Sequence, residues 1–170
     1  MTNSETQRVS LRPYEPADAA ATLSIFTDAI TQTAAAFYSA DQVDAWAKPG
    51  RRSPGTWHVA MAGRASVVAV IGSEVVGFSD IDGNGYIDML FVAPRYVRRG
   101  VARTLLGFLE QRAQEAGTSE LTSNVSVAAR PFFESIGFEV VREQRPVIDG
   151  IEMTNYRMTK AVSPTNATVR

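Results

Sequence analysis

The chain has 170 residues, 45% of them hydrophobic and 21% charged, which suits one globular domain with its own core. Its net charge of −1 argues against nucleic acid as a bulk partner, because binding to a phosphate backbone needs a clear basic excess. The absence of cysteine excludes disulfides, thiolate metal sites and a cysteine nucleophile. The polar start, MTNSETQR, does not resemble a signal peptide, and no run of about 18 apolar residues predicts a membrane span. We therefore expect a cytoplasmic protein without a membrane partner.

The ends of the chain are polar, and no internal repeat divides the part between them. We expect a disordered tail over residues 1–7, a single domain over 8–160 and a polar tail over 161–170. The first element of that domain would be a short strand over 9–12.

Three helices are expected in the next part of the chain. Pro16 is tolerated in a first helical turn and predicts the start of the first helix. Ser39 and Gln42 have the spacing of a capping box, which predicts a second helix. Ser53, followed by a proline, would cap a third.

Valine-rich segments then predict strands. Two of them, over 66–71 and 74–80, would pair through a tight turn. Another is expected over 120–124, and two final strands would flank Asp149-Gly150. With helices among these strands, the order predicts an α/β fold around a mixed, largely antiparallel sheet.

The segment from Tyr86 to Leu106 is the most informative part of the sequence. Its first part alternates and predicts one strand over 86–92, ended by Pro94. One face of that strand would carry Tyr86, Asp88, Leu90 and Val92, and the other Ile87, Met89 and Phe91.

A glycine turn follows this strand and leads into an amphipathic helix. Gly100 would lie at the start of the helix, where unpaired N–H groups and the helix dipole favour an anion, and Gly117 would end the helix. Side-chain charge is added by Arg95, Arg98, Arg99 and Arg103. The residues match neither a Walker loop nor the dinucleotide fingerprint. The turn is nevertheless predicted to bind phosphate.

The motif in this turn resembles that of the GNAT superfamily of acetyl-CoA-dependent N-acyltransferases, Gln/Arg-x-x-Gly-x-Gly/Ala. Together with the segments Arg130-Pro-Phe-Phe-Glu and Gly137-Phe138, this motif makes the sequence most similar to the small bacterial YafP-like branch. The resemblance covers roughly Val9 to Lys160. Val97 stands where the superfamily has Gln or Arg, so one side-chain phosphate contact is missing. The resemblance implies the GNAT fold, a mixed and mostly antiparallel sheet with helices on both faces, and acetyl-CoA as cosubstrate.

The resemblance also implies which residues hold the cofactor. The Leu90 N–H would polarise the acetyl carbonyl, and Val92 would pair with the pantetheine arm. The pyrophosphate would be held by the amides of Arg98, Arg99, Gly100, Val101, Ala102 and Arg103. Ser126 would contact the pantetheine, and Phe91 and Phe133 complete the cofactor contacts. The plainer alternatives are a solvated charged turn at Arg98 and Arg99 and a loop serine bonded to water at Ser126.

The proton-transfer groups are assigned from chemistry and from the resemblance. Asp88 is the first candidate for the general base, with a structural hydrogen-bond acceptor as the alternative. His58, the only histidine, lies outside the motif and is expected to be a surface or hydrogen-bonded residue. A phenyl ring at Phe133 cannot donate a proton, which leaves Tyr156, the preferred acid, and Ser126 as donors to the departing thiolate.

Acceptor recognition would fall to the N-terminal helices and the last hairpin, as in related enzymes. Tyr38 and Trp46 could wall an apolar slot, although core packing explains Trp46 equally well. Tyr86 and Asn155 complete the expected acceptor site. Asn155 and Tyr156 face opposite ways on one strand, so at most one of them enters a given cleft. No residues cluster as metal ligands.

These observations predict an N-acetyltransferase that moves the acetyl group of acetyl-CoA to a primary amine of a small molecule or peptide. The amine would attack directly within a ternary complex, and a homodimer is allowed for. Two other classes fit the phosphate turn: an acetyl-CoA-binding regulator without turnover, and a generic anion-binding module.

Overall fold

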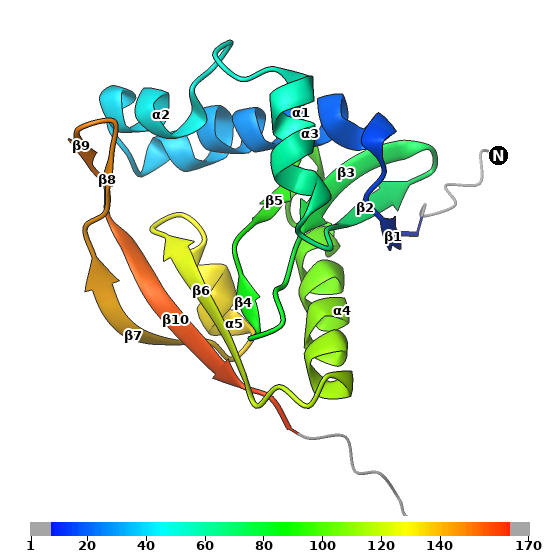
Figure 1. Ribbon diagram of the computed structural model, residues 1–170. Coiled ribbons are helices and arrows are strands. Elements are labelled where there is room, and N and C mark those ends of the chain that lie inside the picture. The colour runs from blue at the N-terminus through cyan, green and yellow to red at the C-terminus, as the bar shows by residue number, and fades with distance from the viewer. Residues whose placement is uncertain (1–7, 164–170) are drawn as a thin grey trace, which may run out of the picture.

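The computed structural model describes residues 8–163, and Figure 1 shows how its elements are arranged. The strands are β1 (Ser10–Pro13), β2 (Val67–Ile71), β3 (Glu74–Ser79), β4 (Tyr86–Ile87), β5 (Leu90–Val92), β6 (Glu120–Ser126), β7 (Glu139–Gln144), β8 (Val147–Ile148), β9 (Ile151–Glu152) and β10 (Asn155–Ala161). The helices are α1 (Ala19–Asp28), α2 (Ala40–Ala47), α3 (Pro54–Ala62), α4 (Val101–Glu115) and α5 (Arg130–Ser135).

The strands form two four-stranded sheets and one short hairpin. The first sheet has the order β1-β2-β3-β5, the second has the order β4-β6-β10-β7, and β8 pairs with β9. β4 and β6 run parallel, and the other pairs run antiparallel. This confirms the mixed, largely antiparallel arrangement, but the sheet is split in two.

The helix starts follow the capping signals of the sequence. The Ser39 hydroxyl accepts from the Gln42 N–H at 3.2 Å, and the Gln42 side chain accepts from the Ser39 N–H at 2.9 Å, which confirms the capping box of α2. Ser53 caps α3 by accepting from the Thr56 N–H at 3.2 Å. The helix expected from Pro16 opens with a 3-10 turn and continues as α1.

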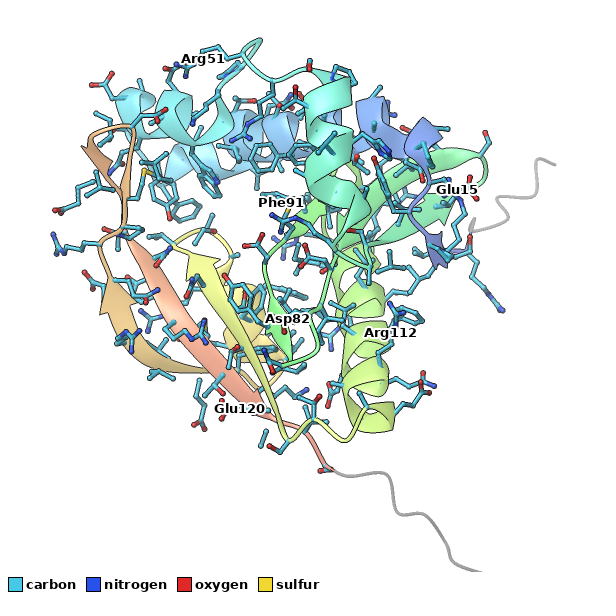
Figure 2. All side chains as sticks on the ribbon, in the orientation of Figure 1. Glu15, Arg51, Asp82, Phe91, Arg112 and Glu120 are labelled. Carbon is cyan, nitrogen blue, oxygen red and sulfur yellow. The ribbon has the colours of Figure 1, made fainter. Side chains whose placement is uncertain are left out.

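Helices cover both faces of the first sheet. α1 and α3 lie on one face with α2 beside them, and α4 lies on the other (Figure 1). The core under α1 and α3 is built from large side chains that include Phe26, Trp57 and Phe78. The core under α4 continues into the second sheet and includes Leu105, Leu109, Leu121 and Met158. α5 packs against β6. Figure 2 shows the side chains that project from the helices and strands into the space between these layers.

The prediction of a single strand over residues 86–92 is wrong. β4 ends at Ile87 and pairs with β6, whereas β5 begins at Leu90 and pairs with β3. Asp88 and Met89 lie between the two strands and belong to neither sheet. The two sheets therefore separate at this point, which opens a wedge between β5 and β6 (Figure 1).

The same interruption changes which side chains share a face. The alternation placed Ile87 with Met89 and Phe91. Instead Ile87 is fully buried in the core under α4, together with Leu90 and Val92, while Met89 and Phe91 pack under α1 and α3. An irregular pair of residues shifts the alternation by one and so reverses the faces that follow it.

The C-terminal part also differs from the expected boundaries. β6 runs on to Ser126, and the turn at Asp149-Gly150 joins only the short β8–β9 hairpin, while the longer pairing is between β7 and β10. Val162 is buried and its N–H donates to the Ser119 carbonyl at 2.9 Å, so the packed part extends two residues past Lys160. The tail predicted over 1–7 and residues 164–170 of the second tail lie outside the described residues.

Candidate active site

The outer edge of β5 presents backbone N–H groups to the wedge. In an antiparallel pair, alternate residues bond to the partner strand. The Ala93 N–H donates to the Val76 carbonyl at 2.8 Å, so Leu90 and Val92 belong to the set whose N–H groups point away from β3. β5 is the last strand of its sheet, and no strand in residues 8–163 covers that edge.

Side chains hold the backbone in place where the sheets separate. Asp80 accepts from the N–H groups of Asp88 at 2.9 Å and Met89 at 3.1 Å. The Ser79 hydroxyl donates to the Met89 carbonyl at 2.6 Å, and the Ser123 hydroxyl donates to the Ile87 carbonyl at 2.8 Å. These side-chain bonds satisfy backbone groups of residues 87–89 that have no partner strand, and they hold the backbone where the two sheets separate.

The phosphate turn has the backbone that the glycine predicted. Gly100 has φ +83° and immediately precedes α4. The Thr104 N–H makes the first helical bond, to the Gly100 carbonyl at 3.0 Å, and no side chain caps the helix. The N–H groups of Val101, Ala102 and Arg103 therefore remain directed out of the helix start, as anion binding requires.

The arginines of this turn divide into two groups. Arg95 forms an ion pair with Glu74, and its guanidinium lies 5.3 Å from the centre of the Tyr96 ring. Arg98, Arg99 and Arg103 are exposed, and within residues 8–163 none of them pairs with a carboxylate. Their charge is thus available to an anion at the start of α4.

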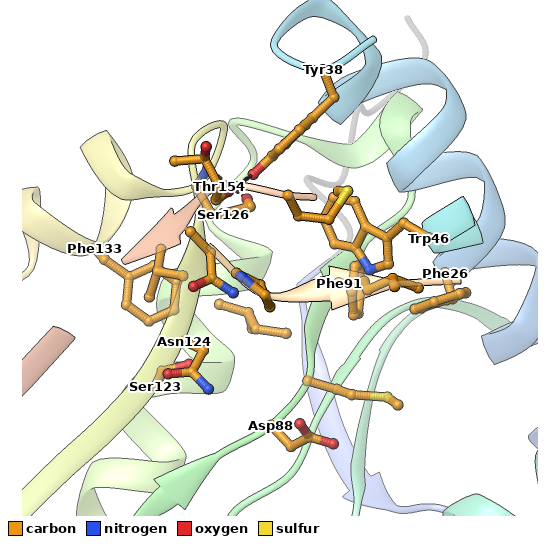
Figure 3. Close-up of a pocket in the computed structure, with 18 of the residues that line it drawn as sticks. Phe26, Tyr38, Trp46, Asp88, Phe91, Ser123, Asn124, Ser126, Phe133 and Thr154 are labelled. Atoms are coloured by element: carbon orange, nitrogen blue, oxygen red, sulfur yellow. Dashed lines mark hydrogen bonds between the residues drawn. The ribbon is translucent and has the colours of Figure 1, made fainter. Parts of the chain in front are cut away.

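Two adjacent cavities lie along the wedge. The larger, of about 370 Å³, is lined by residues of both sheets and of the N-terminal helices, among them Phe26, Trp46, Tyr86, Asp88 and Asn155 (Figure 3). The smaller, of about 150 Å³, follows the edge of β5 and extends to Val97 in the phosphate turn. Both are bordered by Trp46, Leu90, Phe91, Ser126 and Ala129. The two cavities are therefore neighbours along β5, and the smaller one reaches the segment that precedes α4.

Asp88 lies in the wall of the larger cavity, and two neighbours contact its carboxylate. Arg64 of the α3–β2 connection pairs with Asp88, and it also lies 3.4 Å from the carboxylate of Asp80. The Tyr86 hydroxyl is 3.5 Å from the other Asp88 oxygen and accepts from the Asn124 amide at 3.2 Å. Burial, followed by the charge of Asp88, raises the pKa of Tyr86.

Asp80 is the buried member of this acidic pair. Its exposed fraction is 3%, and this burial raises the pKa of the Asp80 carboxyl despite the hydrogen bonds from Met89 and Asp88 that oppose the rise. For Arg64, burial lowers the pKa, but the hydrogen bond and charge of Asp88 outweigh it and leave the pKa above its ordinary value. The guanidinium thus lies between a buried and a partly exposed carboxylate.

The two candidate proton donors lie in different surroundings. Ser126, at the end of β6, lines both cavities, and its oxygen accepts from the Ala129 N–H at 3.1 Å, which leaves its own proton free to be donated. Tyr156 does not line the larger cavity, because Asn155 takes the inward position on β10. The Tyr156 ring packs against the core under α4, with the Arg130 guanidinium 4.5 Å from its centre. The structure therefore brings Ser126, and not Tyr156, to the wedge.

The aromatic residues expected to recognise the acceptor do border the larger cavity. Tyr38 and Trp46 meet edge to face, with ring centres 5.6 Å apart. The Tyr38 hydroxyl donates to the Thr154 carbonyl at 2.7 Å and accepts from the Val127 N–H at 2.9 Å (Figure 3). Burial raises the pKa of Tyr38. This ring thus connects the N-terminal helices to the last strands and shapes the cavity wall.

The remaining cofactor candidates are placed as follows. Phe133 is buried in the core under α4 and also lines the larger cavity. Phe91 borders both cavities and packs edge-on against Phe26, with ring centres 5.0 Å apart. His58 is remote from the wedge, on α3, with its Nδ1 3.0 Å from the Tyr14 hydroxyl.

Three residues of the site were not predicted from the sequence. Asp80 ends an alternating strand, which is a weak signal, because an acid at a strand end is usually exposed. Arg64 and Arg52 come from connections with no recognisable motif. Their roles depend on which distant residues they meet.

Two kinds of feature were not found among the described residues. No group of three or more Asp, Glu or His side chains there is arranged to hold a metal ion. Within residues 8–163 no helix combines the length and the apolar character needed to cross a membrane.

A split sheet with free edge amides, followed by an anion-binding helix start, is the arrangement of coenzyme A-dependent acyltransferases. Comparison with known proteins agrees. Residues 34–160 match the family described as "Acetyltransferase (GNAT) domain". The chain belongs to this family and is an N-acetyltransferase by family.

Among its relatives is the N-acetyltransferase YafP of Escherichia coli (strain K12), which is 41% identical over 151 residues, or 88% of this chain and 94% of that protein. A GCN5-related N-acetyltransferase structure from Rhodopseudomonas palustris superposes with a TM-score of 0.84 at 36% identity, over 89% of this chain and 94% of that one. The PaiA N-acetyltransferase of Thermoplasma acidophilum, solved in complex with coenzyme A, has a TM-score of 0.72 at 19% identity, over 91% and 99% of the two chains. The last likeness concerns the fold alone.

Proposed function

We propose that this protein transfers the acetyl group of acetyl-CoA to a primary amine of a small molecule or peptide, by direct attack within a ternary complex. Three features carry the proposal: the uncapped start of α4, the outward N–H groups of Leu90 and Val92 on the preceding strand, and the two adjacent cavities, of which the larger has Asp88 in its wall. A phosphate, an extended amide-bearing arm and a thioester fit these three parts in that order. Structures of two relatives are described as complexes with coenzyme A and acetyl-CoA, which supports the same cosubstrate here.

The residues divide the chemistry between them. Acetyl-CoA supplies an activated thioester. The Leu90 N–H would donate to the carbonyl oxygen as negative charge develops on it. Asp88, directly or through a water, would accept the proton that the amine loses as its nitrogen bonds to the acetyl carbon. The Ser126 hydroxyl would donate a hydrogen bond to the leaving thiolate and relay a proton to it from solvent, so that the serine regains the proton that it passes on.

Two measurements test the proposal. Calorimetry with acetyl-CoA reports cofactor binding, and release of free thiol in the presence of a panel of primary amines reports transfer. Binding together with amine-dependent thiol release is the expected result. Binding without thiol release on any amine would support the regulator, and binding of simple anions but not acetyl-CoA would support the anion-binding module.

A further inference from the structure

Arg52, which directly precedes the cap of α3, lies in the wall of the larger cavity. Its guanidinium is 5.1 Å from the centre of the Phe26 ring, and one terminal nitrogen is 3.4 Å from the Trp46 carbonyl. Its Nε is buried and has no hydrogen-bond partner among the described residues. A charged donor group is thus held against an aromatic ring with one N–H unsatisfied.

The neighbouring arginine shows the ordinary arrangement. Arg51 is exposed, at the outer surface of the helical layer (Figure 2), and pairs with Asp44 at 2.9 Å. Within residues 8–163, no carboxylate lies within ion-pair distance of Arg52. The Nε has almost no accessible surface, so an acceptor that enters the cavity would meet the terminal nitrogens of Arg52 instead. One of these makes only the long bond to the Trp46 carbonyl, and the other has no hydrogen-bond partner among the described residues, which leaves the charged group open to an acceptor.

The cavity carries opposite charges on separate parts of its wall. Arg52 lies beside Phe26 and Trp46, whereas Asp88 lies apart from both of those rings (Figure 3). The wall also carries apolar side chains, among them Met89 and Phe91. A molecule that satisfies all three features has an ammonium or amine at one end, an apolar middle and an oxyanion at the other.

We propose that the acceptor is a small amine that also bears a carboxylate, and that Arg52 binds this carboxylate while the amine lies beside Asp88. A guanidinium suits this role because its planar donors match the two oxygens of a carboxylate. The assignment rests on the proposed function and names its substrate class. Arg52 is the residue that distinguishes a carboxylated amine from a neutral one of the same shape.

The test uses matched probes that differ only in the carboxylate. These are 4-(aminomethyl)benzoate with 4-(aminomethyl)benzamide, and 6-aminohexanoate with 6-aminohexanamide. For each probe, kcat/KM is measured by thiol release with acetyl-CoA, and Kd is measured by calorimetry with coenzyme A bound. Wild type is expected to prefer the carboxylated member of at least one pair by about 10- to 100-fold, as one hydrogen-bonded charge provides.

Variants assign the preference to the residue. Arg52→Met keeps a long apolar side chain on Phe26 and should abolish the preference, by lowering kcat/KM for the carboxylated probes to the level of the neutral ones. Arg52→Lys keeps the positive charge but lacks the planar guanidinium, and it should retain part of the preference for the carboxylated probes. Arg51→Met is the matched control and should behave as wild type. A thermal unfolding curve of each variant shows that it is folded.

The outcomes separate the two proposals. Equal or absent binding of both members of both pairs in wild type overturns the assignment of Arg52, and this needs no variant. A preference that survives in Arg52→Met also overturns it. A carboxylate preference in binding without any thiol release supports the assignment and contradicts the proposed transfer activity.

Discussion

The buried carboxylate of Asp80 accepts a hydrogen bond of 2.9 Å from the backbone N–H of Asp88. A side chain at the end of β3 thereby fixes the backbone at which the two sheets part. The position of the candidate base and of the β5 amide two residues later both depend on this contact.

Replacing Asp80 should damage both stability and activity. Asp80→Ala leaves the N–H groups of Asp88 and Met89 without their acceptor and removes one carboxylate from Arg64. The free energy of unfolding, measured by urea denaturation, should fall by about 2–4 kcal/mol. Thiol release per folded molecule should also fall, because small displacements of catalytic groups are costly. Asp28→Ala, at a partly exposed position with one long hydrogen bond to Ser24, is the control. Undiminished turnover per folded molecule would show that Asp80 does not govern the position of the β5 amides.

The role of Asp88 can be separated from its ion pair. Asp88→Asn should lower turnover by about a hundredfold, with little change in acetyl-CoA affinity, if the carboxylate is a general base. Arg64→Met removes the ion pair with Asp88, together with the longer contact to Asp80, but leaves the Asp88 carboxylate in the cavity wall. A destabilised Asp88→Asn protein with full activity per folded molecule would assign Asp88 a structural role.

Gly100→Val should abolish acetyl-CoA binding while the fold persists. A Cβ at Gly100 would meet no other atom within 4 Å, so the cost to the free protein comes from its φ of +83° and should be about 1–2 kcal/mol. Loss of binding would then report that the side chain blocks the phosphate. Gly107→Val, in open space within α4 and without a positive φ, is the matched control for calorimetry. Wild-type affinity in folded Gly100→Val would remove the residue from the site.

The source of the proton for the departing thiolate can be decided by a pair of variants. Ser126 lines both cavities, while Tyr156 lies under Arg130 on the other side of β10. We expect Ser126→Ala to reduce the maximal rate modestly, because a thiol pKa near 8.5 makes the thiolate a tolerable leaving group without an acid. Tyr156→Phe should match wild type across the pH range. The reverse pattern would restore Tyr156 as the acid, and two unchanged variants would indicate that solvent supplies the proton.

A pH dependence of stability should come from Asp18. Its buried carboxylate accepts two hydrogen bonds from Arg12, at 2.7 and 2.9 Å, and these lower the pKa of Asp18 below its ordinary value. A lowered pKa stabilises the folded state above the unfolded pKa of about 3.9, and this contribution is lost as the pH falls through the folded value. Asp18→Asn should therefore cost about 1–3 kcal/mol at pH 7.

Urea denaturation of wild type and Asp18→Asn at neutral pH and below pH 4 checks this. The difference between the two proteins should shrink at the lower pH. A difference of equal size at both pH values would contradict the ionic origin of the stabilisation.

Features that depend on neighbouring residues could be predicted from the sequence. The caps at Ser39 and Ser53 and the glycine at the start of α4 are decided within three or four positions of the chain. The family motif also lies within a short stretch of the chain, so it located the phosphate turn and indicated the fold. The β5 alternation of Leu90 and Val92 against Phe91 also held, because it lies within one strand.

The tertiary structure decided the features that join distant segments. Asp80 meets the backbone eight residues later, Arg64 meets a carboxylate 24 residues later, and Tyr38 meets a carbonyl 116 residues later. No local periodicity encodes such partners, since they follow from how the two sheets and the helical layer pack. The separation of β4 from β5, the inward position of Asn155 in place of Tyr156, and the position of Arg52 in the cavity wall are therefore properties of the folded chain and not of any short segment of its sequence.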